Sequence, residues 1–159
     1  MAWTVVNFGK YAGKRKTLPQ IIFEDPDWFF WCYDTKKFIG NLAVEAKEIH
    51  RKASSIRVPQ EGKEPMEVEY IIDSSREKFS DMKLVPISKP EHVGSSFTYR
   101  SKVIDLGVPS KFAAYDKQGG NQMIRRVRFY LFGDSKYKMT QKRCEEFFDK
   151  DENFDLQGT

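Results

Sequence analysis

Basic and aromatic side chains are concentrated near the start of the chain, in a pattern suited to contacting phosphate. Four cations and one aromatic ring stand within seven residues: Lys10, Tyr11, Lys14, Arg15 and Lys16. Cations that neutralise backbone phosphates supply most of the affinity of non-specific nucleic-acid binding, and an aromatic ring among them can stack on a base. We therefore predict that this loop contacts a nucleic-acid backbone. The alternative is a turn that carries basic side chains without a ligand.

The same stretch contains two glycines but does not match a nucleotide-binding P-loop. Gly9 and Gly13 stand four positions apart instead of five. Lys14 is followed by Arg15, where a magnesium-binding Ser or Thr is required. The spacing therefore argues against hydrolysis of a nucleoside triphosphate by this loop.

A second basic stretch, MIRRVRFYLF, lies at residues 123–132, and we predict that it forms a β-strand. Alternate residues of a strand share a face, so this strand and a neighbouring one, FTYRSKVIDL, would together present a basic platform with an aromatic ring. Such a platform binds single-stranded DNA or RNA. The alternative is a solvated sheet face whose arginines pair with Glu67 and Glu69. The residues predicted for the platform are Arg126, Arg128, Tyr130, Arg100 and Lys102.

Carboxylates occur at several places, but their spacing specifies no metal site. A string typical of metal-dependent nucleases occurs as Pro26-Asp27 and Glu45-Ala46-Lys47. Those nucleases need the acidic groups on neighbouring strands around Mg²⁺, whereas both pieces here lie in predicted helices. We predict no catalytic residue, metal or cofactor, and keep a metal-dependent nuclease as an alternative. Other acidic residues near predicted strand ends have no ligand spacing: Asp73, Asp81, Glu91, Asp105 and Asp116.

The cysteines and histidines are too few for most zinc sites, because the chain has two of each: Cys32, Cys144, His50 and His92. We predict buried thiols in a reducing compartment. The first residues lack the features of a signal peptide, and no run approaches the roughly 18 apolar residues that cross a bilayer. We therefore expect a cytoplasmic protein without membrane contact. The net charge of +4 favours anionic partners but does not identify one.

FGKYAGK and the following DPDWFFW resemble the small C-terminal module of exodeoxyribonuclease X. They are also similar to a related family of stand-alone bacterial proteins described as quorum-sensing-regulated virulence factors. The resemblance covers about Val6 to Phe38 and implies association with nucleic-acid processing rather than catalysis. The matching positions are Phe8, Gly9, Lys10, Tyr11, Gly13 and Lys14 in the loop, and Trp28 and Trp31 in the helix.

Hydrophobic periodicity predicts helices in the first part of the chain and strands in the second. Thr17 and Asp25 can each cap a short helix, the second containing Trp28 and Trp31, which we assign to the core. Apolar residues at helical spacing from Ile39 onward predict a longer helix. The remaining predicted elements are a strand at residues 2–8, strands at 67–73, 82–87, 97–106 and 123–132, turns at 92–95 and 118–121, and a final helix at 140–150 packed on the sheet.

We therefore predict an α+β protein with N-terminal strand, loop and helices, followed by a mostly antiparallel sheet and a C-terminal helix. The Pro- and Gly-containing stretch after residue 57 suggests a division into residues 1–57 and 58–159, or one integrated domain. The favoured function is a non-catalytic nucleic-acid-binding or nuclease-associated module of a bacterium or phage. An alternative is a protein-interaction module, such as a small phage-encoded inhibitor of a host enzyme, that uses the strand EVEYIID as a sheet edge.

Overall fold

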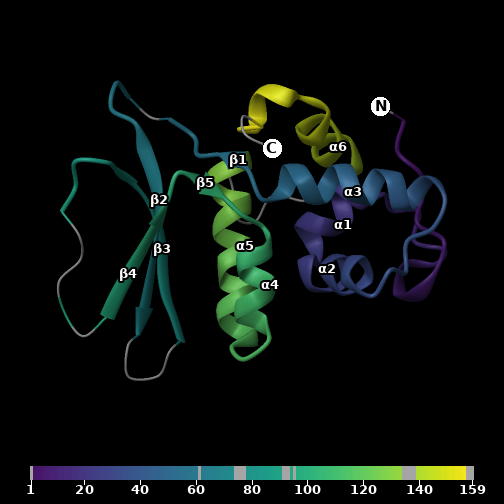
Figure 1. Cartoon of the computed structure of the whole chain (residues 1–159), viewed down its shortest axis with the longest axis horizontal. Helices are drawn as coiled ribbons and strands as arrows, with labels where there is room; N and C mark the ends of the chain where they lie inside the picture. The colour runs from purple at the N-terminus through teal and green to yellow at the C-terminus, as the bar shows by residue number, and fades with distance from the viewer. Residues whose placement is uncertain are drawn as a thin grey trace.

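The chain folds into helices at one end and an antiparallel sheet at the other (Figure 1). The computed structural model describes residues 2–60, 62–73, 78–90, 94, 96–133 and 139–156. The predicted α+β class is confirmed. The helices are α1 (Leu18–Glu24), α2 (Pro26–Asp34), α3 (Asn41–Ala53), α4 (Gly107–Ala113), α5 (Lys117–Phe132) and α6 (Gln141–Asp149), with 3₁₀ turns at Gly9–Tyr11 and Asp151–Asn153. The strands are β1 (Ile56–Arg57), β2 (Met66–Asp73), β3 (Lys78–Pro86), β4 (Ser96–Ser101) and β5 (Val103–Ile104).

Figure 1 shows α4 and α5 between the sheet and the group formed by α1, α2, α3 and α6. The large sheet has the order β3-β2-β4, and β1 pairs with β5 in a separate two-stranded sheet. All of these pairs are antiparallel. The strand EVEYIID is therefore the central strand β2, and our prediction that it forms an edge is wrong.

Local capping and periodicity explain the first three helices. Asp25 caps α2 by accepting a hydrogen bond from the Trp28 backbone N–H at 3.3 Å, as the sequence predicts. Thr17 precedes α1 but makes no capping bond, because its hydroxyl donates to Glu145 of α6 at 2.7 Å. Along α3, Leu42, Ala46 and Ile49 are buried, so these positions of the predicted apolar stripe face the core. Ile39 precedes the helix and is 78% exposed, and Ala43 is exposed, so the stripe is shorter than predicted.

The register of the sheet places different chemistry on its two faces. Tyr70 of β2 lies opposite Tyr99 of β4, and their rings stack with centroids 5.6 Å apart. The next pair along the strands, Glu69 and Arg100, points to the other face because successive strand residues alternate. Arg100 therefore does not share a face with Tyr99.

Residues 123–132 form the C-terminal part of α5, so our prediction of a strand there, with a turn at 118–121, is wrong. Asp116 caps the helix at the Gly119 N–H, at 3.0 Å, and Gly133 ends it in the left-handed region with φ 87°. A Cβ at Gly120 would lie 2.9 Å from the Ala113 Cβ, so α4 and α5 pack closely there. This contact with α4, which we did not predict, overrides the strand propensity of IRRVRFYLF.

Two further predicted placements differ from the structure. Residues 2–8 form no strand ladder, only an isolated bridge between Val5 and Thr17. The C-terminal helix exists and is capped by Thr140 at the Arg143 N–H, but α6 packs against α1 rather than the sheet. The predicted turn at 92–95, with Glu91 and His92, lies largely outside the described residues.

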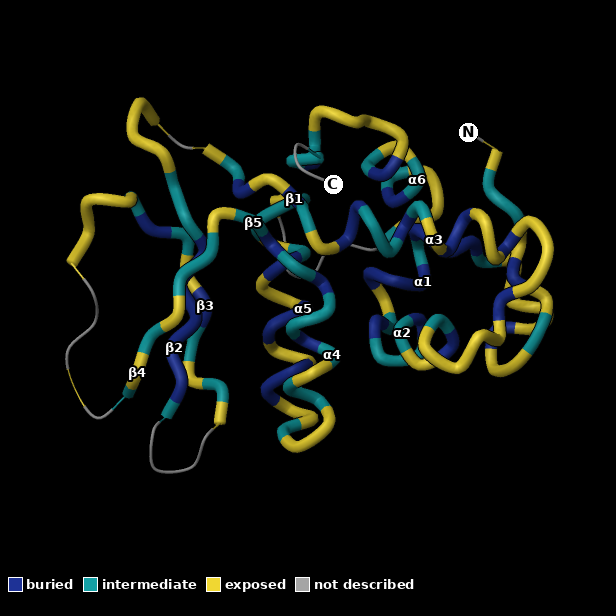
Figure 2. Tube along the Cα trace, viewed as in Figure 1, coloured by how far each residue is buried: buried dark blue, intermediate teal, exposed yellow. Residues whose placement is uncertain are grey.

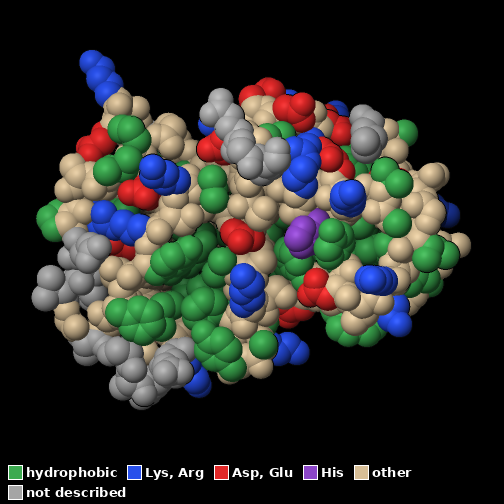
Figure 3. All heavy atoms as spheres, in the orientation of Figure 1, with side chains coloured by type: hydrophobic (Ala, Val, Ile, Leu, Met, Phe, Trp, Pro, Cys, Tyr) green, Lys and Arg blue, Asp and Glu red, His purple; other side chains and the backbone are tan. Residues whose placement is uncertain are grey.

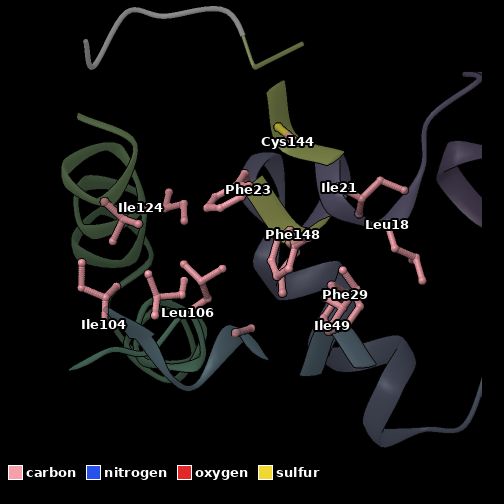
Figure 4. Close-up of a cluster of buried hydrophobic side chains, with 14 of the residues drawn as sticks. Leu18, Ile21, Phe23, Phe29, Ile49, Ile104, Leu106, Ile124, Cys144 and Phe148 are labelled. Carbon is pink, nitrogen blue, oxygen red and sulfur yellow. The ribbon is translucent and has the colours of Figure 1, made fainter. Parts of the chain in front are cut away.

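Buried side chains from both halves of the chain form one hydrophobic cluster. Figure 4 shows Phe23 from the first half in this cluster together with residues of the second half, namely Ile104, Leu106, Ile124 and Phe148. The tube in Figure 2 shows the same pattern, with buried positions on the inner sides of the central helices and of β2. Helices from the first half are therefore positioned by contacts with elements that follow residue 58.

Candidate nucleic-acid interface

The opening loop, residues 9–16, is held against α2 by Asp25. The Asp25 carboxylate accepts a hydrogen bond from the Tyr11 hydroxyl at 3.0 Å and pairs with the Lys10 ammonium at 2.5 Å. Tyr11 is buried, and its burial, followed by the charge of Asp25, raises the pKa of the phenol well above its ordinary value. Two of the predicted nucleic-acid ligands, Lys10 and Tyr11, therefore already have partners within the protein.

Lys10 is exposed but paired with Asp25, and the other two exposed cations of this loop are Lys14 and Arg15. Neither forms an ion pair with a described residue. Gly13 and Arg15 lie in the left-handed region, with φ of 74° and 58°, which glycine adopts easily and arginine rarely. The loop thus presents two adjacent unpaired cations at a turn that is anchored on both sides.

Glu24, at the end of α1, brings the opening loop and α5 together. Its carboxylate accepts from the Lys16 ammonium at 2.5 Å. Its backbone carbonyl accepts from Arg128 Nη2 at 3.1 Å, and the neighbouring Phe23 carbonyl accepts from Arg128 Nε at 2.7 Å. Basic residues from the two predicted sites, Lys16 and Arg128, therefore meet at one residue.

Arg128 serves mainly to close the C-terminal end of α1, since it binds two of its free carbonyls. Burial of the guanidinium lowers its pKa, with an opposing effect of Glu24 and a further lowering by Arg125.

Arg128 lies on a different face of α5 from Arg126 and Tyr130, whereas we predicted that all three share one face of a strand. Because α5 is a helix, successive residues are rotated by about 100°. Arg126 pairs with Asp81 of β3 at 3.2 Å. Tyr130 donates its hydroxyl to the Met82 carbonyl at 2.7 Å, which attaches α5 to β3. The predicted basic strand face therefore does not exist.

The predicted contribution of β4 is also absent. Arg100 pairs with Glu69 at 2.7 Å, and the exposed fractions of the two side chains are 14% and 2%. The alternative prediction, a solvated sheet face with arginines paired to glutamates, included this ion pair. In the structure the pair is largely buried. Lys102 is exposed between β4 and β5.

A groove between β3 and α5 brings together cations and an aromatic ring that the strand assignment separated. Its volume is about 450 Å³. Arg125 and Arg126 line it together with the exposed ring of Phe129. We call this site the arginine groove, and it is lined by Phe79, Ser80, Asp81, Gln122, Arg125, Arg126 and Phe129.

Helical spacing is the signal that could have revealed the arginine groove. Gln122, Arg125, Arg126 and Phe129 follow the i, i+3, i+4, i+7 pattern of one helical face. The buried residues Met123, Ile124 and Val127 occupy the other side of α5. In the strand that we predicted, with a period of two residues, the four groove residues would lie on two opposite faces.

The two acidic residues of the nuclease-like string, Asp27 and Glu45, interact with neighbouring groups of the protein. Glu45 accepts hydrogen bonds from the Thr4 N–H at 2.8 Å and the Thr4 hydroxyl at 2.5 Å. Burial, followed by the charge of Asp25, raises the pKa of Asp27. Within the described part of the chain, no three His, Cys, Asp or Glu side chains are grouped as ligands for a metal ion.

The cysteines and tryptophans have clear environments. Burial raises the pKa of Cys32 to about 11 and that of Cys144 to about 12, so both thiols are protonated at neutral pH. Trp28 packs on Tyr11 and Phe8, with ring centroids 4.9 and 5.6 Å apart. Trp31 is 55% exposed, and its predicted place in the core is wrong.

Comparison with known proteins does not identify a relative of this chain. None of the described helices has the length and apolar composition needed to span a bilayer. The resemblance of residues 6–38 to the exodeoxyribonuclease X module stays a prediction. No protein-family model, curated protein or solved structure matches this chain.

Proposed function

We propose that this protein binds single-stranded nucleic acid without cleaving it, as a nuclease-associated module of a bacterium or phage. The observation that carries the proposal is the arginine groove, where two arginines flank an exposed aromatic ring. Cations for phosphates and a ring for bases are the combination used by proteins that bind single strands. A cytoplasmic location, where such partners occur, belongs to the same proposal.

Arg125 and Arg126 would bind phosphates in the groove. Arg125 forms no ion pair with a described residue, and the pair between Arg126 and Asp81 is half exposed, with exposed fractions of 49% and 30%. Exposed pairs contribute only about 0 to 1 kcal/mol. Exchanging Asp81 for a phosphate therefore costs little, and a bidentate contact of guanidinium to phosphate replaces it.

Phe129 would provide the stacking surface, because 44% of it is exposed beside the two arginines. Stacking of one base on an aromatic side chain contributes about 1 to 3 kcal/mol. Lys14 and Arg15 would contact a further phosphate. The link from the opening loop to α5 through Glu24 supports a path between the two basic regions.

The first prediction concerns the salt dependence of binding. Fluorescence anisotropy with labelled oligo-dT and oligo-U, from about 25 to 200 mM salt, should show a steep loss of affinity. The double variant Arg125→Ala/Arg126→Ala should lower the slope of log K against log salt by about 1.4, since each contact to a single strand contributes about 0.7. Phe129→Ala should weaken binding about tenfold with an unchanged slope.

A matched control removes two positive charges elsewhere. Lys142→Ala/Lys150→Ala changes two exposed lysines in and after α6 and should leave the slope unchanged. Absence of binding at the lowest salt, or an equal effect of the two double variants, contradicts the proposal. The oligonucleotides should stay intact with Mg²⁺ or Mn²⁺ at enzyme excess, and cleavage would instead support the nuclease alternative.

A protein-interaction module is the second candidate, and exposed aromatic side chains favour it. Phe97 and Tyr99 of β4 are 50% and 56% exposed. Exposed aromatic rings of this kind are enriched at protein–protein interfaces. A photo-crosslinking amino acid at Tyr99 should then give a discrete protein adduct in a host extract. The same amino acid at Val44, 71% exposed on α3, is the control, and equal adducts at both positions would count against this candidate.

A further inference from the structure

A small pocket lies where α2, the end of α3 and the start of α4 meet. Its volume is about 250 Å³, below the roughly 300 to 1,000 Å³ of sites for drug-sized ligands. None of its lining residues belongs to the arginine groove or the opening loop. The residues that determine its chemistry are Phe30, Asp34, His50, Asp105, Gly107 and Lys111.

One wall of the pocket is aromatic and fixed in orientation. The His50 imidazole stacks on Tyr33 with ring centroids 4.0 Å apart and planes 12° apart. Phe30 meets the same imidazole edge-on at 5.7 Å. No described residue hydrogen-bonds the ring nitrogens of His50. The wall therefore combines apolar surface with a polar group that is available to a ligand.

The rest of the lining carries both signs of charge. Asp105 accepts a hydrogen bond from the Gly107 N–H through Oδ1 at 2.8 Å, which leaves Oδ2 for a ligand. Asp34 and Lys111 are exposed, and neither pairs with a described residue. Figure 3 shows the histidine on the face turned to the viewer, with acidic, basic and apolar side chains beside it.

Gly107 keeps the space between these groups open. A Cβ at this position would lie 3.0 Å from Asp105 Oδ1 and 3.8 Å from Phe30 Cζ. A larger residue would therefore project between the acidic group and the aromatic wall. The absence of a side chain leaves room for a ligand to contact both.

We propose that this pocket binds a small zwitterion, namely a free α-amino acid. Its ammonium would pair with Asp34 and Asp105, its carboxylate with Lys111, and its side chain would lie on Phe30 and His50. A ligand with only a positive charge would leave Lys111 without a partner, and a ligand with only a negative charge would leave Asp34 and Asp105 without one. A nucleotide phosphate would be repelled by the two carboxylates. This function goes beyond nucleic-acid binding and does not depend on it.

Titration of the isotope-labelled full-length chain with each standard amino acid, observed by NMR, tests the proposal. At ligand concentrations to about 10 mM, at least one amino acid should shift the amide of Gly107 and the ring of His50, with a dissociation constant of about 1 mM or lower. Asp34→Asn and Lys111→Met should each weaken binding at least tenfold. Both residues are exposed, so the fold should be retained, which circular dichroism checks.

Single-charge probes and matched variants complete the test. For the amino acid that binds, the amine that lacks its carboxylate should lose affinity in Asp34→Asn only, and the acid that lacks its amino group in Lys111→Met only, each binding more weakly than the amino acid itself. Glu146→Gln and Lys47→Met, which change exposed residues outside this pocket, should have no effect. The proposal is overturned if no amino acid binds, if both pocket variants bind as the parent does, or if a single-charge probe binds as tightly as the amino acid from which it is derived.

Discussion

Asp25 shows how one side chain fixes the position of several others. It caps α2 and holds both Lys10 and Tyr11. Because these two residues are held, the unpaired cations of the loop are the adjacent Lys14 and Arg15. The cations of this stretch that can bind a ligand are therefore those without a carboxylate partner. The number of basic residues in the sequence does not show which cations these are.

Burial of the thiols makes stability depend on alkaline pH. The pKa of Cys32 is about 11 and that of Cys144 about 12 in the folded protein, against an ordinary value of 9.0. Their contribution to stability is thus fully present below pH 9 and is lost as pH rises toward the folded values. Above pH 9 we expect the free energy of unfolding to fall by about 1.4 kcal/mol per pH unit for each thiol.

Urea unfolding between pH 8 and 10.5 measures this effect. The control is Cys32→Ala/Cys144→Ala, which should be less stable overall but show a smaller decline with pH. Tyr11 and Tyr70, whose pKa values burial also raises, should account for the decline that is left. An identical pH profile in the double variant would show that the thiols do not contribute.

At the level of elements, α5 connects all parts of the fold. It packs on α4 through Gly120, closes α1 through Arg128, and is bonded to β3 through Tyr130. Asp116 also accepts from the Phe79 N–H of β3 at 3.1 Å. These side chains occupy backbone groups of an edge strand that would otherwise be open to pairing with another chain.

Gly120→Ala should destabilise the protein because the new methyl group would lie 2.6 Å from the Pro109 carbonyl oxygen. Overpacking of this kind typically costs about 1 to 3 kcal/mol, which urea unfolding can measure. Gly62→Ala is the matched control, since no atom lies within 4 Å of its added Cβ. Equal stability of the two variants would mean that α4 and α5 separate easily.

For the whole molecule, one domain with a shared core would unfold differently from two domains divided at residue 57. Phe154 is buried in the core, and Ile56 pairs with it in an isolated bridge. The Leu106 N–H donates to the Ala53 carbonyl at 2.9 Å. Contacts of this kind join the helical end of the molecule to the elements beside the sheet.

We therefore expect one cooperative unfolding transition. Hydrogen exchange of amides in the middle of α3 and of β2 should give the same free energy of opening, equal to that from urea unfolding. Phe154→Ala should lower both values together by about 3 to 5 kcal/mol. Independent exchange of the two elements would instead support separate domains at 1–57 and 58–159.

The sequence by itself determined the elements that rest on local signals. The cap at Asp25, the apolar stripe of α3, the strand β2 and the cap at Thr140 each depend on neighbouring residues, and the α+β class follows from them. The tertiary structure alone decided the rest. IRRVRFYLF has the residues of a strand, but the close packing of Gly120 against α4 makes it a helix, and this gathers Arg125, Arg126 and Phe129 in one groove. Arg100 and Arg128 look like surface cations in the sequence, yet bonds to distant partners leave them only partly exposed, because ion pairing and burial depend on contacts that spacing along the chain does not encode.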